Sequence, residues 1–220
     1  MYRHPNNPNL TLVEDSEWNG LPLLPHHGPY VEDYLARAWE TVKRTVEQYR
    51  RVTAIRFDLR MPGHYHDPDS AVISRFMESL KAKLRAAEQR KTRAGTRVHR
   101  TILRSIWVRE QNRSHQPHYH VCILLNGDAY YHLGSFREGQ SKRGNMAMRI
   151  EEAWASALRM TPAQSRGLVQ FPPNRVYRID ANSDQFLTQM VSLFTRLSYF
   201  AKFRTKQYGT GEHCFGSSRR

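Results

Sequence analysis

Two histidines separated by one residue are the first feature of this chain that could do chemistry. His118-Tyr119-His120 precedes the apolar run 121–125, which is typical of a strand. Residues two apart on a strand point to the same face, so both imidazoles can reach one ion. Glu110 ends the preceding strand-like segment and approaches the same face if the two segments form a hairpin. Two imidazoles and one carboxylate leave coordination positions for water and a phosphate, so we expect a catalytic metal site.

Other histidines compete for this role. His64-Tyr65-His66 repeats the tripeptide, but it lies in a segment rich in Gly, Pro and Asp with no apolar strand after it. Because a loop holds side chains less rigidly than a strand, we favour the second copy. The remaining competitors are His26, His27 and His115. A His-x-His pair on a strand is also compatible with structural or merely exposed histidines.

A tyrosine near the C-terminus could act as a nucleophile. A helix is predicted over about 184–206, with an apolar face of Phe186, Met190, Leu193, Leu197 and Phe200. Its polar stripe comprises Thr188, Ser192, Thr195, Tyr199, Lys202 and Lys206. A phenol has a pKa near 10, so Tyr199 needs a metal or a cation such as Lys202 to form phenolate. The alternatives are a tyrosine that only covers the helix edge, and the other tyrosines Tyr208, Tyr130 and Tyr131.

The elements that must position these side chains are helices interleaved with strands. Helices are predicted at about 30–49, 70–92 (with Ser70 as N-cap), 145–158 and 184–206. Strands are predicted at 52–59, 103–110, 119–125, 168–171 and 176–179. This order predicts an α+β fold, a central antiparallel sheet with helices packed on one face. We expect residues 1–28 to form an irregular arm on the body or on a partner, and 29–220 to be a single domain.

The charge of the chain favours a nucleic-acid partner. Lys and Arg number 34 against 20 acidic residues, a net charge of +14, which attracts a polyphosphate. Between Lys81 and Arg100 there are eight basic residues and one acid. A solvated basic helix and a membrane-surface patch are the alternatives. The expected DNA contacts are Lys91, Arg93, Arg97, Arg100, Lys206 and Tyr65.

Neither a membrane nor a secreted location is indicated by the sequence. No apolar run approaches the roughly 20 residues needed to span a bilayer, and the first residues lack the regions of a signal peptide. Cys122 and Cys214 form no disulfide pattern. We therefore expect a cytoplasmic protein with reduced thiols and no membrane partner.

Together these residues resemble the His-hydrophobic-His (HUH) endonucleases, the superfamily of rolling-circle replication proteins and relaxases. His118-Tyr119-His120 is similar to the paired-histidine motif of that superfamily. Glu110 stands where several members place an acidic third ligand.

The C-terminal segment adds to this resemblance. Tyr199 with Lys202 and Lys206 resembles the nucleophile motif of bacteriophage gene A-type initiators, and Phe203 in place of a second tyrosine resembles the single-tyrosine branch. The layout of residues 50–219 is similar to the inovirus-type replication proteins and the YagK/YfjJ C-terminal domain family. Residues 1–28 lie outside the resemblance.

The resemblance implies a ferredoxin- or RNA-recognition-like sheet, in which 52–59 is the strand of the first motif. It implies that His118, His120 and Glu110 bind Mg²⁺ or Mn²⁺. Tyr199 would attack a scissile phosphate and leave a free 3′-OH and a 5′-phosphotyrosine, with Lys202, or alternatively Lys206, in support.

The implied protein is a rolling-circle replication initiator that nicks and rejoins single-stranded or hairpin origin DNA. The chain has no helicase-type phosphate loop, so a separate host helicase is implied as partner. A relaxase or transposase would share the chemistry. Two alternatives come from other functional classes. One is a nuclease that activates water, and the other is a nucleic-acid-binding regulator that does not use the site.

Overall fold

The computed structural model describes residues 1–4, 7–63, 71–111, 116–131, 133–134, 145–209 and 211–219. The helices are α1 (Glu32–Gln48), α2 (Ala71–Arg93), α3 (Met146–Ala157) and α4 (Phe186–Ser198), and a 3₁₀ turn, η1, spans Tyr199–Ala201. The main strands are β6 (Arg51–Arg60), β7 (Arg104–Glu110), β8 (His118–Asn126), β9 (Val169–Gln170), β10 (Val176–Asp180) and β11 (Phe215–Ser217). The N-terminal strands are β1 (Tyr2–His4), β2 (Asn7–Val13), β3 (Glu17–Trp18), β4 (Leu21–Pro22) and β5 (Tyr30–Val31).

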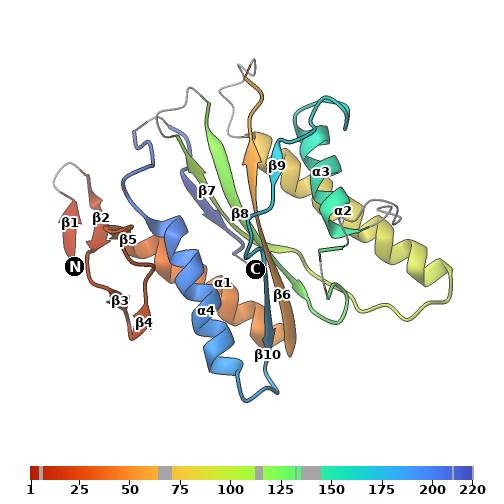
Figure 1. The fold of residues 1–220 in the computed structure, drawn as a ribbon, viewed down its shortest axis with the longest axis horizontal. Helices are drawn as coiled ribbons and strands as arrows, with labels where there is room; N and C mark the ends of the chain where they lie inside the picture. Colours follow the sequence, from red (N-terminus) through yellow and green to blue (C-terminus); the bar gives the residue numbers. More distant parts are fainter. Residues whose placement is uncertain are drawn as a thin grey trace.

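An antiparallel sheet forms the centre of the molecule (Figure 1). Its strand order is β10-β6-β8-β7-β11, and β9 also pairs with β6. The two central strands pair along their length, from Val52 opposite Asn126 to Arg60 opposite His118. The predicted α+β fold with a central antiparallel sheet is confirmed.

Helices cover both faces of this sheet (Figure 1). On one face α2 and α3 pack on the sheet through residues such as Phe57, Phe76 and Trp154. On the other face α1 and α4 pack on residues such as Ala54 and Cys122. The prediction that helices cover one face only is wrong, because β6 and β8 carry buried residues at successive positions, so both faces need cover.

The described residues of the segment 1–28 form short strands that pack on the body. β1 pairs with β2, β2 with β5, and β3 with β4. An apolar cluster joins this segment to α1 and α4 through Val13, Trp18, Leu23, Leu35 and Phe194. The backbone N–H of Leu24 also donates to the Ser198 hydroxyl at 2.9 Å. The irregular conformation expected for 1–28 is therefore wrong, since strand pairing satisfies much of its backbone.

The last helix is shorter than predicted. α4 ends at Ser198, and Lys202 leaves the helical region with φ −54° and ψ 136°. Lys202 then forms a β-bridge with Tyr30, and the N–H of Phe203 donates to the Pro29 carbonyl at 2.8 Å. Because the backbone pairs with the N-terminal segment here, the predicted helix 184–206 is wrong beyond Ala201.

The two cysteines are buried, unpaired thiols. Burial raises the pKa of the Cys122 thiol to about 12, so this group is uncharged at neutral pH. Among the helices of the described ranges, none combines the length and the apolar composition that crossing a bilayer requires.

Candidate metal centre and nucleophile

Two neighbouring strands carry the residues predicted as metal ligands. In the antiparallel pairing of β7 with β8, Glu110 lies directly opposite His118, and His120 follows two positions later. All three side chains therefore point to the sheet face covered by α1 and α4. One nitrogen or oxygen atom from each residue lies within 4.8 Å of the other two. The hairpin thus brings together the three residues that the sequence singled out.

The cluster presents buried polar atoms that the protein itself leaves unsatisfied. Glu110 is 2% exposed and His120 is 6% exposed. Within the described part of the chain, Glu110 Oε1, His118 Nδ1 and His120 Nε2 have no hydrogen-bond partner. Such atoms are costly unless an ion, water or ligand satisfies them. Two nitrogens and a carboxylate oxygen form a donor set that suits a divalent metal ion, so the residues present fit one.

A second carboxylate, which the sequence analysis missed, orients one of the imidazoles. Asp58 of β6 lies opposite His120 of β8, and its Oδ1 is 2.6 Å from His120 Nδ1. This contact holds one ring nitrogen and leaves Nε2 facing Glu110, at 3.4 Å from Glu110 Oε2. A carboxylate behind a histidine is the usual way in which a metal-binding imidazole is held in orientation. The signal available in the sequence was an acid inside the apolar strand 52–59.

The surroundings set the charges of the cluster. Burial acts to raise the pKa of Glu110, but the hydrogen bonds and charges of His120 and two lysines outweigh burial and lower it to about 2. Burial, together with the charge of His120, lowers the pKa of His118 to about 4. At neutral pH Glu110 is therefore ionised and His118 neutral, the forms that bind metal. Burial acts to lower the pKa of His120, but Asp58 and Glu110 raise it overall.

Tyr199 lies at the same end of the sheet, on the turn after α4. Its ring centroid is 5.3 Å from that of His120 and 5.0 Å from that of His27. The Lys202 ammonium donates a hydrogen bond to the Tyr199 hydroxyl at 2.5 Å. The same ammonium lies 2.9 Å from Glu110 Oε2. Lys202 thus joins the candidate nucleophile to the ligand cluster.

The lysines of the predicted polar stripe after Tyr199 are buried. Lys202 and Lys206 are each 7% exposed. Lys206 Nζ donates to the Lys202 carbonyl and lies 3.9 Å from Glu110 Oε1. Burial lowers the pKa of Lys206 to about 7. Lys206 is therefore an interior group beside Glu110, and its role as a DNA contact stays a prediction.

The other candidate tyrosines have different surroundings. Tyr208 stacks on Phe203 with ring centroids 5.1 Å apart, and burial and the neighbouring Tyr34 raise its pKa, so its phenolate is hard to form. Tyr131 is 62% exposed and lies under the Arg178 guanidinium. Burial raises the pKa of Tyr130, which lies near Lys91. Of these four tyrosines, Tyr199 contacts the predicted ligand His120, and its hydroxyl accepts a hydrogen bond from Lys202.

The predicted DNA contacts on the surface are not part of the cluster around Glu110 and Tyr199. Lys91, Arg93, Arg97 and Arg100 are exposed, at the end of α2 and in the segment after it. The predicted contact Tyr65, with its neighbours His64 and His66 and the competing His115, falls outside the described residues. Of the other competing histidines, His27 contacts Tyr199 and His26 is exposed.

The fold and the site define an α+β protein with a candidate metal centre next to a tyrosine. The chain belongs to the YagK/YfjJ C-terminal domain family, whose model matches residues 13–218. This match includes part of the segment 1–28 that the resemblance was expected to leave out.

Two relatives from Escherichia coli (strain K12) extend this comparison. The chain is 38% identical over 201 residues to "Uncharacterized protein YagK", covering 87% of this chain and 95% of that protein. It is 35% identical over 205 residues to "Uncharacterized protein YfjJ", covering 87% of this chain and 96% of that protein. No solved structure gives a significant match to the chain.

Proposed function

We propose that this protein is a metal-dependent, single-tyrosine endonuclease of the HUH type that nicks single-stranded DNA. The observation that carries the proposal is the line of contacts from the Tyr199 hydroxyl through the Lys202 ammonium to the Glu110 carboxylate. This line joins a nucleophile to a candidate metal site, and the two are nearly ninety positions apart in the sequence. Attack of a tyrosine on a phosphate requires both parts at one place.

The side chains of the site have separate tasks in this reaction. The Lys202 hydrogen bond stabilises negative charge that develops on the Tyr199 oxygen. The Arg56 and Arg196 guanidinium carbons lie 5.8 and 5.7 Å from the Tyr199 ring centroid and add positive charge for a phosphate. The ligands Glu110, His118 and His120 would hold the ion, Mg²⁺ or Mn²⁺. When bound, the ion polarises the phosphate and neutralises charge that develops on it.

The bonds of the proposed step balance without another reactant. The Tyr199 oxygen forms a bond to phosphorus and gives up its proton, while the bond from phosphorus to the 3′ oxygen of the preceding nucleotide breaks. That 3′ oxygen takes up a proton and leaves as a 3′-OH, and the downstream strand stays on Tyr199 through its 5′ phosphate. Because the phosphodiester energy is kept, the reverse step rejoins the ends.

The biological setting that we propose is initiation of rolling-circle replication at single-stranded or hairpin origin DNA, in the cytoplasm and with a separate host helicase. A relaxase or transposase would use the same site on different DNA.

The direct test is covalent capture. Purified protein is incubated with labelled single-stranded DNA and Mn²⁺ and separated on a denaturing gel, with and without a chelator. We expect a protease-sensitive adduct with the native chain and none with Tyr199→Phe or with chelator.

The matched control is Tyr131→Phe, the same change at an exposed tyrosine. This control should form the adduct as the native chain does. An adduct formed by Tyr199→Phe would refute the proposal, and cleavage without any adduct would point to the nuclease that activates water.

A further inference from the structure

A second cationic site lies at the opposite end of the sheet from Tyr199. It is a cavity of about 1010 Å³ between the C-terminal end of α1, the middle of α2 and the segment 100–103 that leads into β7. β7 separates the two sites, since it begins at Arg104 beside the cavity and ends at Glu110 in the metal centre. At about 3.4 Å per residue the strand places them roughly 20 Å apart.

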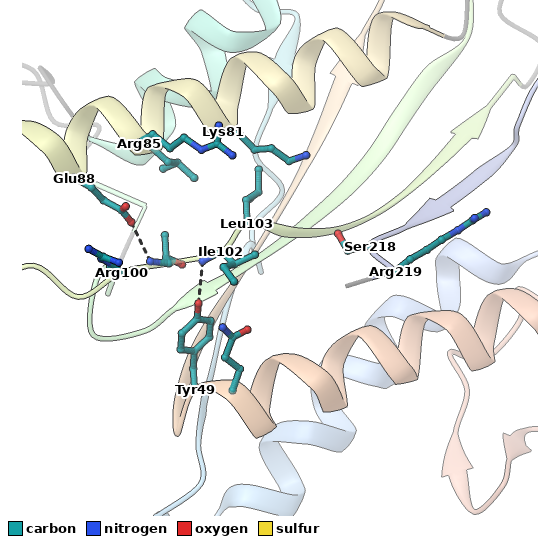
Figure 2. A pocket seen from close by; sticks show the side chains of 12 residues that line it. Tyr49, Lys81, Arg85, Glu88, Arg100, Ile102, Leu103, Ser218 and Arg219 are labelled. Atoms are coloured by element: carbon teal, nitrogen blue, oxygen red, sulfur yellow. Dashed lines mark hydrogen bonds between the residues drawn. The ribbon is translucent and has the colours of Figure 1, made fainter.

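Positive charge dominates this cavity (Figure 2). Lys81 and Arg85 extend from α2, and Arg100 and Arg219 come from the chain before β7 and after β11. Of these, the Arg85, Arg100 and Arg219 side chains are exposed and form no ion pair with any acid in the described part of the chain.

The single acid of the cavity is already engaged. Glu88 Oε1 accepts a hydrogen bond from the backbone N–H of Thr101 at 2.9 Å, as Figure 2 shows. Lys81 pairs with the exposed Glu78 at 2.8 Å, outside the cavity lining. Four cationic side chains against this one acid leave the lining positively charged overall, so it can attract an anion with several charges.

An aromatic ring and an apolar side chain lie among these cations. The Tyr49 hydroxyl accepts a hydrogen bond from the Ile102 N–H at 2.9 Å, which holds the ring in the lining of the cavity (Figure 2). Ile102 itself is 52% exposed. Cations that alternate with exposed apolar and aromatic surface are the features with which proteins bind unpaired nucleic-acid strands.

We infer that this cavity is a second binding site, for a single-stranded nucleic acid, separate from the cleavage site. Arg85, Arg100 and Arg219 bind phosphates of the strand, and Tyr49 with Ile102 contacts one of its bases. A small apolar ligand does not fit the lining, which is cationic where such pockets are apolar. A duplex would present its phosphates on an outer surface and would leave the Tyr49 ring without a base to contact. The binding does not depend on the proposed nuclease activity.

The test is binding without catalysis. Fluorescence anisotropy measures the affinity for a labelled oligothymidylate of about 16 nucleotides in buffer with chelator, at several salt concentrations. The variant Arg85→Gln/Arg100→Gln removes two phosphate contacts, and circular dichroism checks its fold. The control Arg50→Gln/Arg166→Gln removes the same charge from exposed positions outside the cavity.

Two lost contacts should make the log–log salt slope shallower by about 1.4, and should weaken binding by about 10–30-fold near 0.1 M salt. The control variant should lose no more than about twofold. Equal losses in both variants, or native affinity in the cavity variant, would overturn the inference. Competition by blunt duplex as strong as by single strand would also overturn it. Because no cleavage is measured, each result holds whether or not Tyr199 forms an adduct.

Discussion

Glu110 is the residue that connects the two halves of the candidate site. Its carboxylate lies 3.4 Å from His120 Nε2 and 2.9 Å from Lys202 Nζ. It is buried, and the opposite charges around it keep its pKa near 2, so it stays ionised down to low pH. In the proposed site this carboxylate would serve both a bound cation and the lysine that contacts Tyr199.

Asp58 acts through His120 as a positioning residue, and its removal should weaken metal binding. We expect Asp58→Ala to reduce the affinity for Mn²⁺ by about 10–100-fold, because the imidazole loses the group that orients it. Titration of free Mn²⁺ by electron paramagnetic resonance measures this affinity.

The control for that measurement is Asp128→Ala. Asp128 pairs with Arg51 at 2.5 Å, away from the ligand cluster, and its removal should leave Mn²⁺ affinity unchanged. Native affinity in Asp58→Ala would show that His120 does not need Asp58, and would weaken the assignment of the cluster as a metal site.

Residue types and spacing were enough to single out the candidate ligands and the tyrosine. They were not enough to predict that Asp58 contacts His120 or that Lys206 is buried. His118, His120 and Glu110 lie on one hairpin, so local alternation predicts that they meet. Asp58 meets His120 only through the register of β6 with β8, and pairing of distant strands is not encoded by local spacing. The burial of Lys206 likewise depends on the turn after α4, which the N-terminal segment imposes.

At the scale of elements, the C-terminal strand β11 closes the sheet beside β7. Gly216 lies opposite Trp107 in this pairing. A Cβ atom at position 216 would come within 2.3 Å of the Trp107 indole, closer than real Cβ contacts allow. The short strand therefore pairs only because the residue opposite the tryptophan has no side chain.

Gly216→Ala should destabilise the protein. Displacing a large ring or the strand costs about 1–3 kcal/mol, which corresponds to a lower Tm by roughly 2–10 °C for a chain of this size. Differential scanning calorimetry gives the Tm. Gly63→Ala, at a position with nothing within 4 Å of the added carbon, is the control and should shift the Tm little. An unchanged Tm for Gly216→Ala would contradict the close packing of β11 on Trp107.

Local periodicity predicted where most elements lie, and tertiary contacts decided the rest. The helix expected at 70–92 is α2, and its apolar stripe, which includes Phe76 and Leu80, is fully buried. The prediction of helices on one face of the sheet was wrong. Successive residues of the run 121–125 are apolar, which is typical of a strand that is covered on both faces. The end of α4 could not be predicted, because its backbone groups pair with residues near position 30.

For the whole molecule, the two ends of the sheet differ in character. One end holds a buried cluster of ligands, a tyrosine and a lysine, and the other holds an exposed cationic cavity. A net charge of +14 would attract a polyanion such as a nucleic acid to the surface as a whole. In our proposal the first end carries the chemistry and the second holds the strand.

Metal binding should stabilise the whole fold. An ion that binds only the folded chain adds about 2.7 kcal/mol at a concentration 100 times its Kd, so we expect Mn²⁺ to raise the Tm by roughly 5–10 °C. Scanning fluorimetry with and without Mn²⁺ measures the shift. The variant His118→Ala/His120→Ala should show none, and His64→Ala/His66→Ala should keep it. A full shift in the first variant would place the metal elsewhere.

The most direct measurement of the central claim is the identity of the residue that carries DNA after the reaction. The native chain is incubated with single-stranded DNA and Mn²⁺, digested with nuclease and trypsin, and analysed by mass spectrometry. Cleavage after Arg196 and Lys202 yields the peptide 197–202, which contains Tyr199, whereas Tyr208 falls in the peptide 207–219. We predict a nucleotide linked through its 5′ phosphate to the peptide 197–202. A nucleotide on 207–219 or on any other peptide, or none on any peptide while the DNA is cut, would contradict the assignment of Tyr199 as the nucleophile.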